Sequence, residues 1–188
     1  DALPIALDLG GVRLTGSLHG LWPNGHLLAS YSRVGRRFDL EHFIRHLVLN
    51  CALQREPRTG YPRTSRLVAR CAEGDGVAQV EFAPVNNAEA VLGTLIGLMR
   101  ESRHAALPFV FDPSRAYALA RLEDGSDPAA ALAEAQKVFD KQARLGPDAY
   151  VALCFPNVED LLHAEGPLGF GALAEAVFGP LLACRSET

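Results

Sequence analysis

The sequence is poor in several features on which whole classes of protein depend. Among its 188 residues there are one methionine, one tryptophan, two lysines and four cysteines. No apolar run approaches the ~20 residues that a membrane-spanning helix needs, so we expect no membrane contact. Glycine and proline follow no repeat, which excludes a collagen-like fibre. The first residues lack an initiator methionine and the pattern of a signal peptide, so we expect a piece of a longer protein.

The few cysteines are scattered along the chain and show no C-x-x-C spacing. They are Cys51, Cys71, Cys154 and Cys184. Structural zinc sites pair their ligands at short spacing, and small secreted domains carry dense disulfide frameworks. We therefore expect reduced, buried thiols in a cytoplasmic protein, with no metal site built from these residues.

The composition that is present is ordinary for a globular protein. Hydrophobic residues make up 48% of the chain and charged residues 21%, which excludes wholesale disorder. A chain of this length forms one domain, or one domain with a small lobe. It is long enough to bury a substantial core.

Charge is distributed unevenly along the chain. The net charge is −4, yet residues 33–70 hold nine arginines against three acids and carry +6, whereas residues 71–188 carry −9. Concentrated positive charge favours contact with phosphates or with an acidic protein partner. The alternative is a solvated loop and helix face in a protein that prefers arginine to lysine. Both interpretations stay open from the sequence.

Hydrophobic periodicity predicts strands in the first half of the chain and helices in the second. Two turns, at Pro23-Asn24-Gly25 and at residues 73–76, favour hairpins. Asp39 and Asp127 are expected as helix N-caps. The predicted strands cover residues 5–9, 12–21, 26–31, 65–72, 77–82 and 107–111; the predicted helices cover 38–54, 87–102, 113–121, 127–144, a short stretch between 157 and 166, and 168–182; residues 150–155 are expected as a strand or a buried turn.

This order of elements predicts an α/β (α+β) fold, with a central mixed sheet flanked by helices. We expect an α/β core over residues 1–112. A mostly helical lobe over residues 113–188 is expected to pack on that core as part of the same domain.

One segment resembles a known family. Residues 4–16, PIALDLGGVRLTG, resemble the start of the C-terminal domain of the RecC (gamma) subunit of bacterial exodeoxyribonuclease V, the RecBCD complex. The likeness continues through the turn at residues 23–25, the helix around Leu47 and the stretch at 107–109. It covers nearly the whole chain in layout and is specific over roughly the first fifty residues. The family domain is similar to the PD-(D/E)xK nuclease domain of the RecB subunit, so the resemblance implies a nuclease-like core.

Active nucleases of that fold place one Asp on a first strand and an Asp-x-Lys on the next. The carboxylates hold a divalent metal, and the lysine orients the attacking water. At the matching positions this chain has His19, Ser30 and Ser32. Neutral imidazole and hydroxyl groups do not make the anionic, oxygen-rich site that magnesium needs. The resemblance therefore implies degenerate catalytic positions, no metal and no cofactor for this domain.

The resemblance also implies a role. RecBCD is an ATP-dependent helicase–nuclease that processes double-strand DNA ends for homologous recombination, and RecC is its non-catalytic scaffold. The implied partners are the RecB and RecD subunits, double-strand DNA ends and single-stranded DNA; Mg²⁺ and ATP are used elsewhere in the complex. Arg33, Arg36 and Arg37 lie beside the degenerate positions and are the candidates for contact with phosphate or with an acidic partner.

Two alternatives remain open. One is an active metal-dependent DNA exonuclease in which Asp8, Glu41 or Glu81 rebuilds a metal site. The other is a pure protein-docking module that never touches DNA. His42 and His46 are spaced by four residues, as zinc ligands on a helix can be, but no carboxylate ligand accompanies them, and we expect partly exposed helix histidines.

Overall fold

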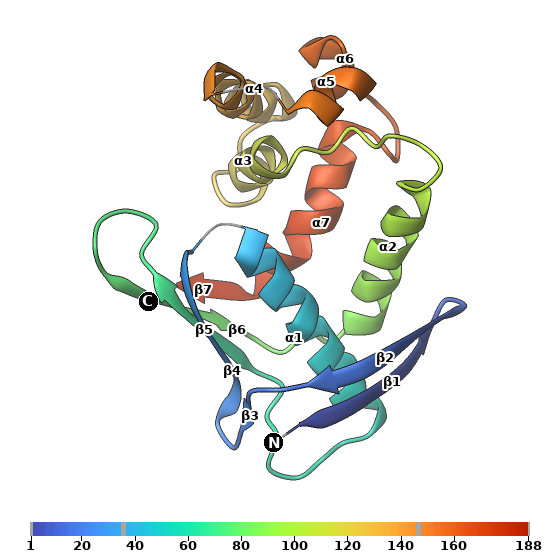
Figure 1. Cartoon of the computed structure of the whole chain (residues 1–188), viewed down its shortest axis with the longest axis vertical. Helices are drawn as coiled ribbons and strands as arrows, with labels where there is room; N and C mark the ends of the chain where they lie inside the picture. Colours follow the sequence, from blue (N-terminus) through green and yellow to red (C-terminus); the bar gives the residue numbers. More distant parts are fainter. Residues whose placement is uncertain (1, 35–36, 146–147, 188) are drawn as a thin grey trace. The chain divides into compact units, whose positions relative to one another are not determined.

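The chain forms the mixed architecture shown in Figure 1, a computed structural model that describes residues 2–34, 37–145 and 148–187. It divides into two compact units, residues 1–96 with 183–188 and residues 97–182. Within the described residues every strand belongs to the first unit, and helices make up the second. The predicted α+β class is therefore confirmed.

The chain opens with a two-stranded antiparallel ribbon, β1 (Leu3–Leu9) and β2 (Val12–Leu18). Gly10 and Gly11 make its turn with φ of 56° and 81°, a left-handed region that glycine enters without steric cost. Side chains of β1 alternate strictly between buried and exposed, as one face of a strand packs and the other meets water. The buried members, which lie toward α1 (Arg37–Arg55), are Leu3, Ile5, Leu7 and Leu9.

The second sheet has five strands in the order β3-β4-β5-β6-β7. Their bounds are Leu21–Trp22, Gly25–Arg33, Ser65–Arg70, Val77–Phe82 and Arg185–Glu187. The β4–β5 pair is parallel and the other pairs are antiparallel. Parallel neighbours need a crossover connection, and α1 supplies it. The sheet is therefore mixed, as predicted.

Helix α1 packs on the inner face of this sheet, against β4 and β5. Phe43 and Leu47 on the helix, and Leu67 and Phe82 on the strands, are fully buried. These positions recur on one helix face and on alternate strand residues, as the periodicity requires. Fully burying side chains of this size stabilises the fold by roughly 1.5–3 kcal/mol each.

Strand β4 is irregular in its second half. Its register against β5 shifts between Ala29 and Arg33, where β4 has extra residues. Inside this bulge the backbone N–H of Ser32 donates to the hydroxyl of Ser30 over 3.0 Å. A hydroxyl that satisfies a nearby backbone donor stabilises a local turn at the expense of the ladder. The bulge therefore falls on the segment that includes Ser30 and Ser32.

The last strand returns to the first unit and pairs with β6. Strand β7 was not predicted, because three residues after a helix show too little periodicity to indicate a strand. Arg185 on β7 lies 3.6 Å from the carboxylate of Asp39 on α1, and both side chains are largely buried. This ion pair ties the end of the chain to the first turn of α1.

The second unit packs helices around one hydrophobic cluster. The helices from residue 88 onward are α2 (Ala88–Glu101), most of which belongs to the first unit, and α3 (Phe111–Leu122), α4 (Pro128–Leu145), α5 (Ala149–Cys154), α6 (Val158–Leu162) and α7 (Phe170–Cys184). Tyr117 and Phe170 meet edge to face at the centre, with ring centroids 5.7 Å apart. No helix in the described ranges is long and apolar enough to cross a membrane.

Four local predictions are wrong. Residues 107–110 form no strand, and residue 111 begins α3. Residues 149–154 form the short helix α5, capped by the carboxylate of Asp148. Asp39 is not an N-cap, because α1 already begins at Arg37. The prediction for Asp127, in contrast, is confirmed, because its carboxylate accepts a hydrogen bond from the backbone N–H of Ala130 over 2.9 Å, as an N-cap does.

The fourth error concerns the strand predicted over residues 12–21. Its first part, β2, ends at Leu18 and pairs with β1. The chain then forms the separate two-residue strand β3, which pairs with β4. Gly20 has φ of 80°, and a Cβ there would lie 2.6 Å from the carbonyl oxygen of Leu27. The chain therefore turns at Gly20, where only glycine fits.

Candidate functional site

The three residues that the resemblance matches to nuclease positions, His19, Ser30 and Ser32, lie on β4 and just before β3. His19 is exposed and sits outside the strands, between β2 and β3. Ser30 is half-buried and Ser32 is exposed, and both belong to the β4 bulge. No carboxylate is bonded to any of these three side chains in the hydrogen bonds and ion pairs of the described residues. Ser30 and Ser32 therefore lie in a bulged strand, and His19 lies in the link between two strands.

The three candidate arginines lie in different surroundings. Arg33 directs one guanidinium nitrogen to the backbone carbonyls of Cys71, Ala72 and Gly74, at 3.0, 3.3 and 2.9 Å. It therefore clamps the turn between β5 and β6. Arg37 is exposed at the start of α1. Arg36 lies outside the described residues.

The other arginines of residues 33–70 also have partners. Arg63 donates to the side chain of Asn86 over 3.0 Å. Five form ion pairs: Arg45 with Glu41, Arg55 with Glu89, Arg58 with Glu56, Arg66 with Glu81, and Arg70 with Asp75. Three of these acids come from beyond residue 70, so positive charge that is concentrated in the sequence is neutralised in space. The structure favours the interpretation of a solvated, self-paired surface.

The core of the first unit contains a polar cluster that was not predicted from the sequence. His26 on β4 and His42 and His46 on α1 are all 0–1% exposed. The rings of His26 and His42 stack with centroids 5.0 Å apart. The prediction of partly exposed helix histidines is therefore wrong. The spacing of four residues was visible in the sequence, but its direction toward the sheet was not.

Hydrogen bonds fix the protonation of two of these rings. The Nε2 of His46 lies 3.0 Å from the carbonyl of Ala83, so it must be the donor. Its Nδ1, 2.8 Å from the hydroxyl of Ser65, then accepts. The same hydroxyl oxygen lies 3.3 Å from Nδ1 of His26, which donates to it. The resulting chain links β4, β5 and α1 with every imidazole neutral.

Asn50 on α1 extends this cluster to the loops around it. Its amide nitrogen donates to the backbone carbonyls of His46 and Arg63, at 2.9 and 3.1 Å, and its oxygen accepts from the N–H of Val85 at 3.0 Å. Neither ring nitrogen of His42, in contrast, has a hydrogen-bond partner among the described residues. A buried polar group without a partner costs about 1–3 kcal/mol.

Burial sets the pKa values of the three rings. It lowers the pKa of His42 to about 3 and that of His46 to about 4, because the charged form loses its hydration. It also lowers the pKa of His26, against an opposing backbone hydrogen bond at His19. The positive charges of Arg45 and Arg63 lower these values further. These rings are therefore neutral, enclosed core groups at physiological pH.

Nothing in the described part of the chain gathers a metal-binding set. No group of three or more His, Cys, Asp or Glu side chains there is arranged to hold an ion. Asp8, Glu41 and Glu81 lie on β1, α1 and β6, and the latter two are engaged by Arg45 and Arg66. The four cysteines are free, but only Cys51 is buried and Cys154 is exposed, so the expectation of buried thiols is wrong for most of them.

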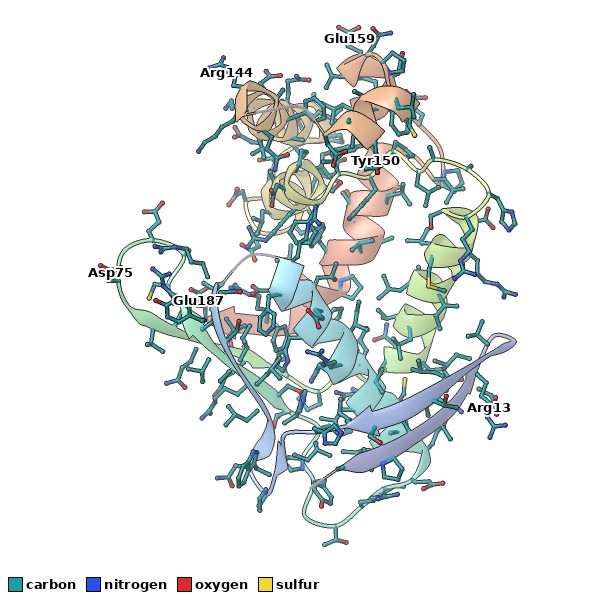
Figure 2. The ribbon with its side chains drawn as sticks, in the orientation of Figure 1. Arg13, Asp75, Arg144, Tyr150, Glu159 and Glu187 are labelled. Carbon is teal, nitrogen blue, oxygen red and sulfur yellow. The ribbon has the colours of Figure 1, made fainter. Side chains whose placement is uncertain are left out.

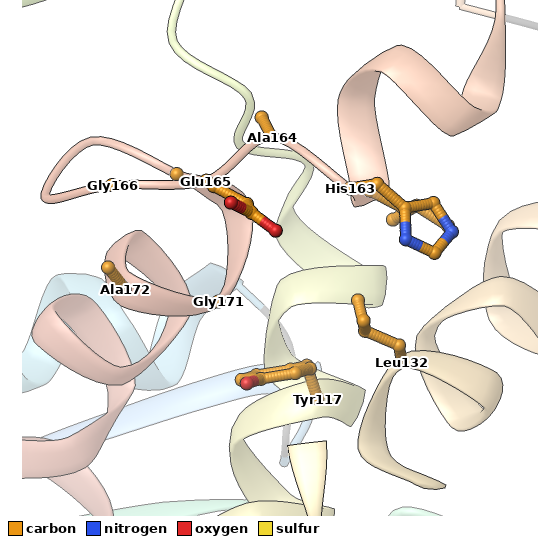
Figure 3. A pocket seen from close by; sticks show the side chains of 10 residues that line it. Tyr117, Leu132, His163, Ala164, Glu165, Gly166, Gly171 and Ala172 are labelled. Atoms are coloured by element: carbon orange, nitrogen blue, oxygen red, sulfur yellow. The ribbon is translucent and has the colours of Figure 1, made fainter. Parts of the chain in front are cut away.

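Cavities also lie in each of the two units. In the first unit, a cavity of about 240 Å³ at the end of the sheet is lined by Thr64, Ser65 and Ser186, among others. In the second unit, one of about 400 Å³ is lined by Tyr117, His163 and Glu165, among others, whose side chains Figure 3 shows. No hydrogen bond joins these three side chains to one another in the described residues.

The glycines beside the second cavity have packing reasons. A Cβ at Gly171 would lie 2.7 Å from the hydroxyl of Tyr117, and one at Gly169 would lie 2.3 Å from the carbonyl of Ala164. Real Cβ atoms do not approach so closely. Close packing at the start of α7 therefore accounts for these glycines without a phosphate ligand.

Fold and site together define a mixed α+β domain whose polar residues serve its own structure. The family model of the RecC C-terminal domain matches residues 1–122. The chain therefore belongs to the RecC C-terminal domain family, and with it to the RecC subunit of the RecBCD complex, which acts in DNA repair. No protein among the curated ones matches the chain significantly.

Proposed function

We propose that this domain is a non-catalytic scaffold of RecC, which supports subunit assembly and guides DNA strands during double-strand break repair by homologous recombination. The observation that carries the proposal is the chemistry of His19, Ser30 and Ser32. These residues stand where the resemblance places the metal-binding and water-orienting groups of an active nuclease. Ser30 instead serves the backbone of Ser32. The domain then needs no cofactor of its own, while Mg²⁺ and ATP act elsewhere in the complex.

A nuclease assay tests the loss of catalysis. The full RecC subunit, purified without its sister subunits, is incubated with linear DNA and Mg²⁺ or Mn²⁺, with a chelator control. We expect no metal-dependent cleavage. If cleavage appears, Glu81→Gln and Asp8→Asn identify a rebuilt site, and Asp75→Asn serves as the matched control because its carboxylate is 99% exposed.

Arg33, Arg36 and Arg37 are the proposed contacts to DNA or an acidic partner. Arg36 and Arg37 are the pair to replace, because Arg33 also holds three backbone carbonyls and its loss would disturb the β5–β6 turn. Replacing both with Ala should weaken DNA binding by the assembled complex and flatten its salt dependence. Each lost phosphate contact lowers the slope of log K against log salt by about 0.9. Arg58→Ala, which removes another exposed arginine of the same segment, is the control. An unchanged slope would remove the DNA role and leave the docking role.

The same proposal assigns RecB and RecD as partner subunits and the cytoplasm as the compartment. Membership of the RecC family supports the first assignment. The four unpaired thiols support the second, because disulfides are rare in reducing compartments. Assembly with purified RecB and RecD, followed by light scattering, tests the partner assignment directly.

A further inference from the structure

Helix α5 of the second unit leaves large apolar side chains in solvent. None of its six residues is buried. Val151 packs against the hydrophobic cluster of the unit, whereas Tyr150 is 83% exposed and Leu153 is 79% exposed. Tyr150 and Leu153 are three residues apart, so they lie on one side of the helix. Exposed aromatic and aliphatic groups that lie together mark surfaces at which proteins interact.

The segment that contains α5 and α6 carries negative charge that is not neutralised. Residues 148–165, called here the α5–α6 surface, include four acids and no lysine or arginine. The acids are Asp148, Glu159, Asp160 and Glu165. Across the described ranges, none of the four forms an ion pair. Four negative charges therefore stay available to a partner.

The surrounding unit strengthens this negative charge. Residues 97–182 hold 12 acids against 7 lysines and arginines, a net charge of −5. Arg144 precedes the segment on α4 and lies apart from Tyr150 and Glu159 in Figure 2. A field of this sign attracts a basic partner and repels the phosphates of DNA. The charge therefore selects a basic protein segment at this surface.

The cavity of about 400 Å³ lies at the end of the same segment. Leu162, His163 and Glu165 are among the residues that line it. Pockets that receive ligands have volumes of roughly 300–1,000 Å³. A carboxylate forms strong, charge-assisted hydrogen bonds with an ammonium or guanidinium group. The cavity can thus receive a lysine or arginine side chain, which Glu165 would neutralise.

We propose that the α5–α6 surface is a docking site for a basic amphipathic segment of a sister subunit. Apolar side chains of that segment cover Tyr150 and Leu153. Its lysine or arginine side chains pair with Glu159 and, at the cavity, with Glu165. This inference rests on the proposed function, in which RecC assembles with RecB and RecD.

Site-specific photocrosslinking tests the proposal. Tyr150 is replaced by p-benzoylphenylalanine in the full RecC subunit, which is then assembled with RecB and RecD and irradiated with and without single-stranded DNA. We expect an adduct to a segment of RecB or RecD that carries lysine or arginine beside apolar residues. The same photoreactive residue at Leu122, which is 47% exposed on α3, is the control and should not label that segment. An adduct to DNA, or none to a sister subunit, overturns the proposal.

Reversal of charge gives an independent readout. Glu159→Lys with Glu165→Lys should raise the dissociation constant for the sister subunits by about tenfold, because attraction becomes like-charge repulsion. The effect should shrink in high salt, which screens exposed charges. Glu123→Lys with Asp124→Lys makes the same change of charge at two exposed residues of the same unit. This control should leave the dissociation constant unchanged.

Removal of the apolar groups completes the test. Tyr150→Ser with Leu153→Ser should also raise the dissociation constant by about tenfold, with little dependence on salt. Met99→Ser, at an apolar residue that is 48% exposed, is the matched control. The single variant Leu153→Ser guards against misfolding of the double variant, and circular dichroism checks both. Failure of unmodified RecC to assemble would refute the proposed function, whereas normal assembly of every variant would refute only the docking site.

Discussion

The inner and outer faces of the five-stranded sheet use similar residue types for opposite purposes. The inner face encloses aromatic and imidazole rings, among them Phe43, Phe82 and His42, at no exposure. The outer face presents Trp22 and Tyr31 to solvent. An aromatic ring contributes to folding on the first face and is available for binding on the second. In this unit the depth of burial of a ring, rather than its residue type, decides whether the ring stabilises the fold or faces solvent.

Among the substitutions that test this comparison, Phe43→Ala should have the largest effect on the unfolding free energy. This side chain is fully buried against His46 and Phe82. The substitution removes apolar contacts and leaves a cavity, which costs about 3–5 kcal/mol of unfolding free energy. Urea denaturation followed by circular dichroism measures it. A loss below about 1 kcal/mol would mean that the inner face is not the core of the unit.

A second test concerns the buried ion pair at the edge of the inner layer. Asp39→Asn leaves the largely buried Arg185 with Glu187 as its remaining carboxylate partner. Breaking a buried pair costs several kcal/mol when the remaining charge has no other partner, and because Glu187 stays in place we expect a smaller loss of about 1–2 kcal/mol. Glu41→Gln, two residues away on the exposed side of α1, is the control and should change stability by under about 0.5 kcal/mol.

A third test uses pH. The folded state lowers the pKa of His42 to about 3 and of His46 to about 4, below the unfolded value of 6.5. Stability is therefore complete above pH 6.5 and falls as pH drops through the window from 6.5 to about 3, because the unfolded chain binds more protons. Each ring contributes a slope of about 1.4 kcal/mol per pH unit within its own window.

The variant His42→Leu sharpens this test. It should lower the slope of the unfolding free energy against pH, in the acid range, by the contribution of one ring, about 1.4 kcal/mol per pH unit. It should also raise the unfolding free energy near pH 7 by about 1 kcal/mol, because it removes two buried nitrogens that lack partners in the described residues. Exposed His104→Leu is the matched control and should change neither. Denaturation midpoints at pH 7, 6, 5 and 4 give both quantities. An unchanged slope would show that His42 is protonated in the fold or is hydrated.

The smallest expected effect is on the outer face. Tyr31→Ser removes a ring that is 86% exposed and touches Arg70, so the unfolding free energy should change by about 0.5 kcal/mol or less. The same denaturation experiment measures it. A loss comparable to that of Phe43→Ala would abolish the distinction between the two faces.

The sequence predicted most elements because their hydrophobic periods are strong. Helix α1 and the β5–β6 hairpin lie within a few residues of their expected bounds. It failed where tertiary geometry decides: Gly20 ends β2 early through its approach to Leu27, and residues 149–154 become helical around an Asp148 cap. Neither effect is visible in apolar spacing.

The roles assigned to the candidate site residues stay predictions, and the sequence did not show how these residues are arranged. His19, Ser30 and Ser32 were selected from a resemblance, whereas the pairing of Ser30 with the backbone of Ser32 depends on a bulge that no period reports. The arginine segment looked like a basic patch because its neutralising acids Asp75, Glu81 and Glu89 lie far along the chain. The histidine cluster was missed because its members come from β4, β5 and α1, which only the tertiary fold brings together.

Because β7 lies at the end of the chain, the five-stranded sheet can be completed only late in synthesis. A ribosome produces β3 to β6 and α1 early, but the neighbour that closes the edge of β6 is encoded at residues 185–187. Until those residues emerge, the nascent sheet keeps an open strand edge that can pair with another chain. The second unit is thus inserted between two parts of the first, as Figure 2 lets the reader trace from Arg13 through Arg144 to Glu187. A premature stop anywhere in the later half would release a protein prone to aggregation, even though most of its first unit had already been translated.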